Sequence, residues 1–262
     1  MPQAVVVIPA RFASTRFPGK VLATLAGRPL VVHACHIASR ARQVDDVIVA
    51  TDDERVTDVV RDAGFRAVLT SETHASGTDR VAAVARTMRA EIVIGLQADE
   101  PFLAEDDLDA LVSALDENPT GGPPSLATLS APLRERTRWL DPNVVKVVTD
   151  DAGRALYFSR SPLPYRRARD GTLSSPPEGD PPAGTMMHVG VYGWRRESLL
   201  AFAELPPSAL ERAEGLEQLR ALAAGWRILV LPAKGDAFGI DTPEDLERAE
   251  RRLAEPTRTD ER

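Results

Sequence analysis

The stretch "AVVVIPARFASTRFPGK", from Ala4 to Lys20, joins a strand signal to a cationic loop. Its first six residues, through Pro9, form a short apolar run rich in β-branched side chains, which is typical of a strand buried on both faces. The residues that follow include Arg11, Arg16 and Lys20 and no acid. We therefore predict a buried first strand that ends in a loop suited to a small anion, because open α/β sheets bind ligands at such strand ends.

The charge of the whole chain is opposite to that of its beginning. The 262 residues include 32 Lys and Arg against 39 Asp and Glu, which gives a net charge of −7, yet every charged residue up to position 44 is Arg or Lys. An acidic body argues against general nucleic-acid binding, which needs a basic field. A local cationic loop in such a body suits a small polyanion better than a polymer.

Length and composition indicate an ordinary globular chain. It is long enough for one large domain, and 43% hydrophobic with 27% charged residues is typical of a folded soluble protein. Cys35 is the only cysteine, so no intrachain disulfide can form, which fits a reducing cytosol. We expect neither a signal peptide nor a membrane span, and therefore a cytoplasmic protein with no membrane insertion.

Strand and helix signals alternate through the first half, which predicts a mostly parallel sheet with helices on both faces. Thr51 and Glu54 are predicted to form a capping box for the second helix. The predicted strands cover 4–9, 46–51, 66–70 and 91–97, and the predicted helices cover 29–41, 52–63, 78–89 and 105–118.

The second half first turns strand-rich and then helical. The last helix has a strong start, with Thr242 as N-cap, Pro243 after it and Asp245 as the third residue. We predict one domain over 1–254, with loose segments at 118–125, 166–184 and 255–262. The predicted strands cover 125–132, 143–150, 155–159, 188–194 and 227–232, and the predicted helices cover 195–203, 208–223 and 242–255.

Two acidic motifs are candidates for binding a metal ion. Asp99, in "LQADEP" (96–101), directly follows a predicted buried strand, where a carboxylate can bind Mg²⁺ together with phosphates and water. Asp241, in "GIDTPED" (239–245), is not needed as a helix cap because Thr242 can take that place. The alternatives are a polar turn for Asp99 and an acid attracted by the helix dipole for Asp241. Spacing alone does not bring the two together.

A third motif, "HASGTDR" (74–80), precedes a predicted helix. Its Ser76-Gly77-Thr78 segment offers free N–H groups that can bind an anion or a base edge, and Arg80 adds a cation. The alternative is an ordinary N-cap by Ser76 or Thr78. Both interpretations stay open at this point.

Two further segments carry polar side chains on otherwise apolar elements. In the predicted helix 208–223, Glu217 shares a face with Leu210, Ala213 and Ala221, so that it can serve a hydroxylated ligand or pair with the arginine three residues later. In the predicted strand "HVGVYGW", residues 188, 190 and 192 lie on one face. A lone histidine on a strand is usually structural. The chain has no Walker A loop, dinucleotide fingerprint, Cys/His cluster or nucleophile motif.

Together these segments resemble the bacterial 3-deoxy-manno-octulosonate cytidylyltransferases, or CMP-Kdo synthetases. The first motif is similar to that of all cytidylyltransferases for acidic sugars, and "ALYFSR", "HVGVYGW" and "LEQLR" resemble the branch specific for 3-deoxy-manno-octulosonate (Kdo). The motifs follow one another along nearly the whole chain as "IPARFASTRFPGK", "ATDDE", "HASGTDR", "LQADEP", "NVVKVV", "ALYFSR", "HVGVYGW", "AEGLEQLR" and "GIDTPEDLE".

This resemblance implies an α/β nucleotidyltransferase fold, Rossmann-like and of the glycosyltransferase-A type, with a mixed, mostly parallel sheet, flanking helices and a strand-rich subregion. Within the single domain it implies a nucleotide-binding part over about 1–130, a sugar-binding and dimerisation part over about 131–225, and a return to the main sheet over 226–254. It further implies a homodimer that uses Mg²⁺ and converts CTP and Kdo to CMP-Kdo and pyrophosphate, the activation step for lipopolysaccharide synthesis.

The resemblance also implies a set of site residues. Catalysis is assigned to Arg11, Lys20 and Asp99, and the metal to Asp99 and Asp241. The nucleotide is assigned to Ala10, Arg11, Ser14, Thr15, Arg16, Lys20, Ser76, Gly77, Thr78, Arg80 and Gln97. The sugar acid is assigned to Arg160, His188, Tyr192, Glu217 and Gln218.

Three positions depart from the family pattern. Ala98 replaces a usual glycine, Arg212 a frequent histidine, and Tyr165 a frequent tryptophan. The last two fall near the sugar-acid segments, so the alternatives are another 2-keto sugar acid, such as 8-amino-Kdo or a sialic acid. Two other classes stay open: a non-catalytic nucleotide-sensing module, and a glycosyltransferase that uses Asp99 and Glu100 as its metal motif.

Overall fold

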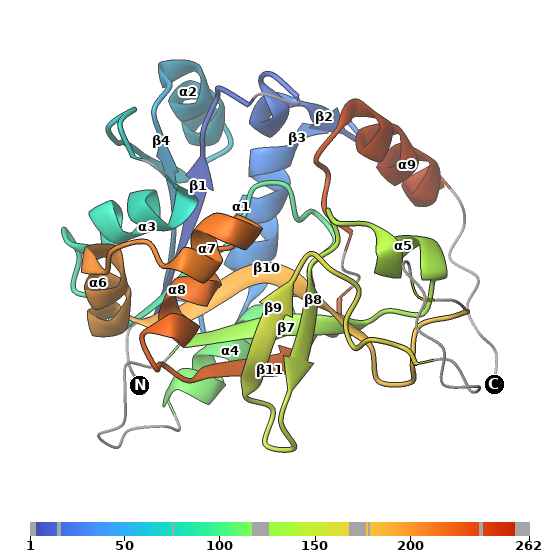
Figure 1. Ribbon diagram of the computed structural model, residues 1–262. Helices are drawn as coiled ribbons and strands as arrows, with labels where there is room; N and C mark the ends of the chain where they lie inside the picture. The colour runs from blue at the N-terminus through green and yellow to red at the C-terminus, as the bar shows by residue number, and fades with distance from the viewer. Residues whose placement is uncertain are drawn as a thin grey trace.

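One mixed sheet of nine strands joins both halves of the chain (Figure 1). The computed structural model describes residues 4–14, 17–74, 76–116, 126–167, 177, 179–235 and 238–254. The strand order is β11-β7-β10-β6-β1-β4-β5, with β8 paired to β10 and β9; β2 and β3 form a separate small ribbon. The strands are β1 Ala4–Ala10, β2 Thr24–Leu25, β3 Arg28–Pro29, β4 Asp46–Thr51, β5 Arg66–Leu69, β6 Ile92–Gly95, β7 Leu126–Pro132, β8 Lys146–Thr149, β9 Ala155–Ser159, β10 Met186–Arg195 and β11 Ile228–Pro232.

The direction of the strands decides which loops meet. β1 runs parallel to β4 and β6, with Ala10 beside Thr51 and Val7 beside Gly95, so these strands end at one edge of the sheet. β10 runs antiparallel to β6 and pairs Tyr192 with Gly95. The residues of β10 before Tyr192 therefore extend past the end of β6, toward the loops that follow β1 and β6.

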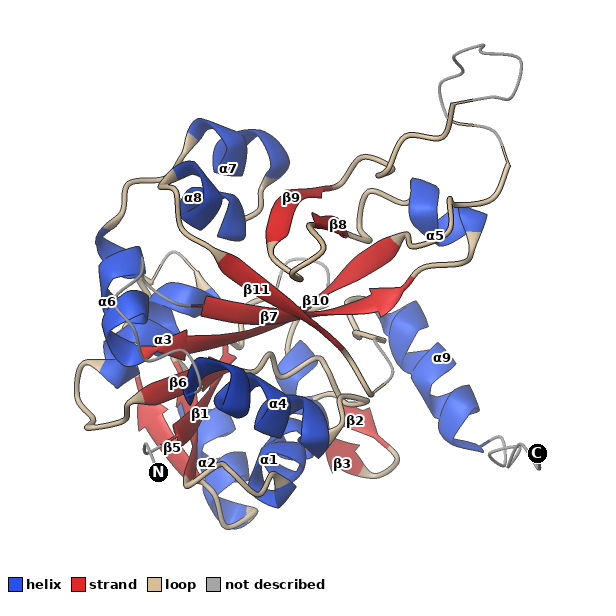
Figure 2. Ribbon diagram, turned by 90° about the horizontal axis from the view of Figure 1, so that it is seen from below, coloured by secondary structure: helices blue, strands red, loops and turns tan. Residues whose placement is uncertain are grey.

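Helices cover both faces of the sheet. α1 (Leu30–Arg40), α2 (Glu54–Asp62) and α4 (Glu105–Asp116) pack on one face. α3 (Gly77–Ala85), α6 (Arg196–Glu204) and α8 (Gln218–Ala223) pack on the other, and Figure 2 shows α1, α2 and α4 lying apart from α6 and α8. The remaining elements are the 3₁₀ turn η1 Lys20–Leu22 and the helices α5 Arg136–Leu140, α7 Ala209–Glu214 and α9 Pro243–Ala254.

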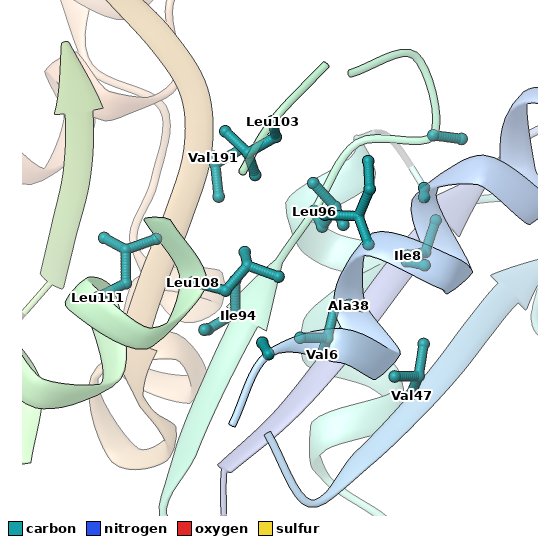
Figure 3. Close-up of a cluster of buried hydrophobic side chains, with 14 of the residues drawn as sticks. Val6, Ile8, Ala38, Val47, Ile94, Leu96, Leu103, Leu108, Leu111 and Val191 are labelled. Carbon is teal, nitrogen blue, oxygen red and sulfur yellow. The ribbon is translucent and has the colours of Figure 1, made fainter. Parts of the chain in front are cut away.

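The first strand is buried on both faces, as its sequence predicts. Val6 and Ile8 belong to the core under α1 and α4, whereas Val5 and Val7 belong to the core under α3 and α6. This is the side-chain alternation of a strand between two helical layers. Figure 3 shows part of the first core with its labelled side chains Val6, Ile8, Ala38, Val47, Ile94, Leu96, Leu103, Leu108, Leu111 and Val191.

A third, smaller apolar cluster joins the two ends of the described chain. It buries Leu25 and Leu30, which follow the cationic loop, together with Ile240 and Ala249, which lie before and within α9. The ring of Phe102 packs edge-on against that of Phe238 at its margin. The cluster therefore holds the segment after η1 against the segment that enters α9.

The predicted fold class is confirmed, but two local predictions are wrong. Asp53, not Thr51, caps α2, because its carboxylate accepts a hydrogen bond from the backbone N–H of Arg55. Thr51 is still the last residue of β4, and its hydroxyl donates to the carbonyl of Ala10 at 2.7 Å. The capping box of α9 is confirmed by the mutual hydrogen bonds of residues 242 and 245.

The predicted single helix over 208–223 is also wrong. Gly215 has a left-handed φ of 63° and ends α7, and α8 begins only at Gln218. Glu217 is the N-cap residue of α8 and does not share a helical face with Leu210. Its proposed arginine partner, Arg220, instead pairs with Glu211 through contacts of 2.9 and 2.5 Å. Glycine supports this break because it adopts left-handed backbone without a Cβ clash.

Some predictions fall outside the described residues. They are the connector 118–125, most of the loop 166–184, the tail 255–262, and the positions of Thr15 and Arg16. In the ranges that are described, we find no helix with the length and apolar character needed to cross a membrane.

Lys146, at the start of β8, is a fully buried cation. Its ammonium donates to the carbonyl oxygens of Asp141, Val144 and Arg160 at 2.9, 2.5 and 2.6 Å. Burial lowers its pKa from 10.5 to about 8; the charge of Asp141 acts in the opposite direction. The lysine thus joins the turn before β8 to the end of β9. Burial makes its charged form less favourable in the folded chain than in the unfolded chain.

The lowered pKa of Lys146 predicts that the stability of the protein depends on pH. Between pH 8 and 10.5 the unfolded chain keeps a proton on Lys146 that the folded chain loses, so the contribution of this residue to the free energy of unfolding rises with pH. From pH 7.5 to 9.5, the free energy of unfolding of the wild type minus that of Lys146→Met should rise by about 2 kcal/mol in denaturant titrations. A difference that stays constant with pH would contradict the lowered pKa.

Candidate active site

Three segments that are far apart in sequence meet at one ammonium group. The Nζ atom of Lys20 lies 2.5 Å from Oδ2 of Asp99 and 3.0 Å from Oδ1 of Asp241. Asp99 follows β6, and the backbone N–H of Ile240 donates to the carbonyl of Asp99 at 2.9 Å. This hydrogen bond and the small cluster around Ile240 fix Asp241 beside Asp99. The two acidic motifs therefore converge, which spacing alone did not determine.

The charges at this junction are strongly coupled. Burial alone would lower the pKa of Lys20, but the two carboxylates raise it above its usual value. Burial raises the pKa of the neighbouring Glu100 to about 8, and the charges of Asp99 and Asp241 add to the effect. At neutral pH the junction thus carries two carboxylates and one ammonium, with Glu100 largely protonated.

The donor set at the junction fits Mg²⁺. Two carboxylate oxygens already face one positive charge, and hard oxygen ligands are those that Mg²⁺ prefers. Among the described residues no group of three or more His, Cys, Asp or Glu side chains gathers around a metal-sized space. Two carboxylates are nevertheless enough for Mg²⁺, which completes its shell with substrate phosphates and water.

On one side of the junction lies a cavity of about 370 Å³ between the end of β1 and the start of α3. Gly77 is close to the floor of this cavity, since a Cβ atom added there would lie 3.4 Å from Pro9 and 3.5 Å from the amide of Gln97. Ser76 caps α3 by accepting from the N–H of Asp79. The cavity is lined by Pro9, Arg11, Ala13, Ser14, Lys20, Val21, Leu30, Ser76, Gly77, Arg80, Gln97, Ala98 and Asp99.

Two arginines line this cavity, one exposed and the other buried. Arg11 is exposed and donates to the carbonyl of His74 at 2.9 Å. Arg80 is buried and donates to Asp52 at 2.7 Å and to Thr70 at 2.5 Å. Asp52 also accepts from the N–H of Phe12, so it links the cationic loop to α3. Sequence reasoning gave Asp52 no role, although the quoted motif "ATDDE" contains it.

On the other side of the junction lies a cavity of about 450 Å³, lined by Pro142, Asn143, Val145, Arg160 and Asp241. Arg160 follows β9, and its guanidinium donates to the carbonyls of Glu214 at 2.6 Å and Pro142 at 2.9 Å. The carboxylate of Glu214 accepts from the backbone N–H of Arg160. A half-buried cation thus faces the same space as Asp241.

A larger cavity of about 770 Å³ also reaches Asp241 and includes His188 and Gly190 in its lining. The ring of His188 contacts those of Phe158 and Tyr192, with centroids 5.1 and 5.3 Å away. The predicted alternation is confirmed, since His188 and Tyr192 lie on one face of β10.

Glu217 connects the two sides of the site. Its Oε2 accepts from the hydroxyl of Thr78, in the first turn of α3, at 2.6 Å. Burial raises the pKa of Tyr192 well above its usual value, and the charge of Glu217 adds to this. Gln218 is buried at the start of α8. The break at Gly215 is what turns residue 217 toward α3.

Many of the described residues of the predicted site line the cavities beside the junction, whereas Tyr192, Glu217 and Gln218 line none of these three cavities. The nucleotide set lies at the ends of β1 and β6 and the start of α3, and Ala10 bonds to Thr51 through its carbonyl. The sugar set lies along β9, β10 and the start of α8. Sequence reasoning missed the anchoring contacts of Asp52 and Lys146. Asp52 pairs with Arg80, which is distant in the chain, and the ammonium of Lys146 bonds to backbone carbonyls.

The chain is similar to known proteins in both sequence and fold. Residues 5–228 match the family model described as Cytidylyltransferase. A solved structure of CMP:2-keto-3-deoxy-manno-octonic acid synthetase complexed with CTP superposes with a TM-score of 0.84 at 38% identity, over 96% of this chain and 98% of that one. A 4-diphosphocytidyl-2C-methyl-D-erythritol synthase from Anaerococcus prevotii, at 14% identity and a TM-score of 0.61, shares the fold.

Curated relatives give a narrower assignment. The 3-deoxy-manno-octulosonate cytidylyltransferase of Geobacter sulfurreducens is 48% identical over 94% of this chain and 98% of its own length. The enzyme of the same name from Anaeromyxobacter dehalogenans is 48% identical over 97% and 99%. The resemblance noted in the sequence is confirmed, and the chain belongs to the 3-deoxy-manno-octulosonate cytidylyltransferases.

Proposed function

We propose that this protein transfers CMP from CTP to the anomeric 2-hydroxyl of Kdo and releases pyrophosphate, the step that activates Kdo for lipopolysaccharide synthesis. The observation that carries this proposal is the junction of Lys20, Asp99 and Asp241 between a cavity with a cationic rim and a cavity that holds Arg160. The names and the CTP complex of its relatives support the same reaction.

On the nucleotide side, the chain's own residues bind and orient the triphosphate. Arg11, Ser14 and Lys20 line the cavity at the end of β1, and the sequence adds Thr15 and Arg16 to the same loop. Cations there stabilise the charge that grows on the leaving pyrophosphate. The start of α3, with Ser76 and Gly77, and the end of β6, with Gln97, receive the cytidine.

Lys20 and the two carboxylates form the centre of the proposed mechanism. The ammonium between Asp99 and Asp241 holds both acids in place before substrate arrives, and it can then turn toward a phosphate oxygen. When bound at these acids, Mg²⁺ would neutralise phosphate charge and lower the pKa of the attacking hydroxyl. Asp99 takes the proton that the attacking hydroxyl loses, and pyrophosphate leaves from the opposite side of the phosphorus. Catalysis rests on an in-line arrangement of hydroxyl, phosphorus and leaving group.

On the sugar side, Arg160 is the cation suited to the carboxylate of the sugar acid, and His188 lines the larger cavity that also reaches Asp241. His188 and the residues that the resemblance adds, Tyr192, Glu217 and Gln218, carry groups suited to the sugar hydroxyls. Residues 131–225 would also supply the interface of a homodimer that works in the cytoplasm. Two of the three departures from the family pattern lie at exposed places, since Tyr165 is exposed and the exposed side chain of Arg212 bonds the carbonyl of Pro207. The third, Ala98, is buried and lines the cavity at the end of β1.

The substrate is tested by pyrophosphate release from CTP with a panel of sugar acids. Kdo should support turnover, and 8-amino-Kdo and a sialic acid should support less. If only another sugar acid supported turnover, that acid and not Kdo would be the acceptor. CTP binding without pyrophosphate release would instead indicate a nucleotide sensor, and consumption of a CMP-sugar would indicate a glycosyltransferase.

Removal of either charge at the junction should stop the reaction. Lys20→Ala and Asp99→Asn should each lower turnover by about 100-fold or more, because phosphoryl transfer depends on positioned charge. Circular dichroism and thermal unfolding would check that both variants fold. The matched control is Lys234→Ala, an exposed lysine that bonds Asp106 away from the cavities. Near-normal turnover of either junction variant would remove the residue from the mechanism.

The proposed metal site makes a separate prediction. Chelation with EDTA should reduce turnover to background, and added Mg²⁺ should restore it. Asp241→Asn should raise the Mg²⁺ concentration needed for half-maximal turnover about tenfold or more, because one of two carboxylate ligands is lost. Asp106→Asn is the control, because this half-buried acid in the first turn of α4 pairs with Arg42 and Lys234 and lines none of the three cavities. Full turnover in EDTA would contradict the metal assignment.

A further inference from the structure

Thr128, in the middle of β7, is a buried residue with three polar neighbours. Its hydroxyl oxygen lies 2.9 Å from Nε2 of His188, 2.7 Å from the carbonyl oxygen of Val191 and 3.3 Å from that of Val189. A threonine hydroxyl carries a single proton, so it can donate to only one of these neighbours at a time.

An irregularity in the sheet creates this arrangement. β10 pairs regularly with β7 up to Val189, opposite Leu129, and resumes at Tyr192, opposite Thr128. The two intervening residues form a bulge, and bulges redirect backbone and side chains beside functional sites. Here the carbonyls of Val189 and Val191 both approach the hydroxyl of Thr128.

The positions of the donors and acceptors settle the proton on His188. Carbonyl oxygens only accept, so the hydroxyl proton of Thr128 goes to Val191, the nearer carbonyl. The hydroxyl oxygen is then the acceptor for Nε2, which must carry a hydrogen. The opposite arrangement would leave two oxygen lone pairs facing each other at 2.7 Å without a proton between them.

The surroundings of the imidazole fix its charge and its plane. Burial lowers the pKa of His188 to about 3, so the ring is neutral throughout the physiological pH range. The ring of Phe158 packs edge-on at 80° to the imidazole, and the ring of Tyr192 packs against it at a tilt of 45°. A neutral ring with its hydrogen on Nε2 keeps a lone pair on Nδ1. His188 lines the cavity that Asp241 also lines.

We propose that Thr128 is a positioning residue, which holds His188 as the neutral Nε2–H tautomer so that Nδ1 accepts a hydrogen bond from a hydroxyl group of the sugar acid. This role rests on the proposed function. It assigns His188 to a hydroxyl donor and not to the sugar carboxylate, because two acceptors cannot share a hydrogen bond. The carboxylate is left to a cation such as Arg160.

The tautomer is measured directly by ¹⁵N NMR of the imidazole nitrogens in the free full-length protein. We expect a protonated Nε2 and an unprotonated Nδ1 for His188 from pH 6 to 8. His188→Gln identifies the signal by its disappearance. A hydrogen on Nδ1, or an imidazolium in this pH range, would overturn the proposal whatever the catalytic activity of the protein.

A kinetic experiment compares the KM values of two variants. Thr128→Val keeps the shape of the side chain and removes the hydroxyl, whereas Thr128→Ser keeps the hydroxyl. Thr128→Val should mix the two tautomers and raise the KM for Kdo about tenfold, the loss of roughly one hydrogen bond, with the KM for CTP unchanged. Thr128→Ser should restore both the tautomer and the KM. The control is Thr57→Val, a buried threonine of α2 whose hydroxyl lies near the carbonyl of Asp53.

The outcomes separate this inference from the proposed function. An unchanged KM for Kdo in Thr128→Val, or equal changes for CTP and Kdo, would overturn the positioning role. Loss of folding in Thr128→Val with a normal KM in Thr128→Ser and the predicted wild-type tautomer would support it. Failure of the wild type to release pyrophosphate with any sugar acid would overturn the proposed function and with it the contact of His188 with the sugar. The tautomer that Thr128 sets would still stand or fall by the NMR result, since it is read without substrate.

Discussion

The ammonium of Lys20 joins the two carboxylates that the rest of the site is built around. The three residues come from the loop after β1, the loop after β6 and the entry to α9, and their contact needs all three segments to meet. Apolar packing brings the outer two together through Leu25 and Ile240, and a backbone hydrogen bond from Ile240 to Asp99 adds the third. The charged centre therefore depends on a small hydrophobic cluster beneath it.

The topology of the sheet explains why two cavities meet at this centre. Parallel strands β1 and β6 deliver the loops of the proposed nucleotide site to one edge, and antiparallel β10 begins beyond that same edge with His188 of the proposed sugar site. An all-parallel sheet would have placed the start of β10 at the opposite edge. The hydrogen bond from Thr78 to Glu217 links the sides directly, so that binding on one side can stabilise the other.

The sequence predicted what depends on local patterns and missed what depends on distant contacts. β1 and β4 were recognisable because short β-branched runs are typical of strands buried between two layers of helices. The break at Gly215 was hidden, because helical periodicity continues on both sides of it and only the backbone conformation reveals it. The pairing of Arg80 with Asp52 spans 28 positions, which no spacing rule detects. The family resemblance supplied a set of predicted site residues but not the contacts that hold them.

Arg80 and Arg160 are held by different kinds of hydrogen-bond acceptor, and this difference gives the two arginines different roles. Arg80 is paired with the carboxylate of Asp52, so its charge is largely compensated and its main effect is to fix α3 against the loop after β4. Arg160 donates to the carbonyls of Pro142 and Glu214, which orient the guanidinium without neutralising it. A carbonyl-held cation retains its attraction for an incoming carboxylate. The attraction of the cavity that holds Arg160 for an anion therefore depends on the kind of acceptor that holds the arginine, more than on the number of arginines present.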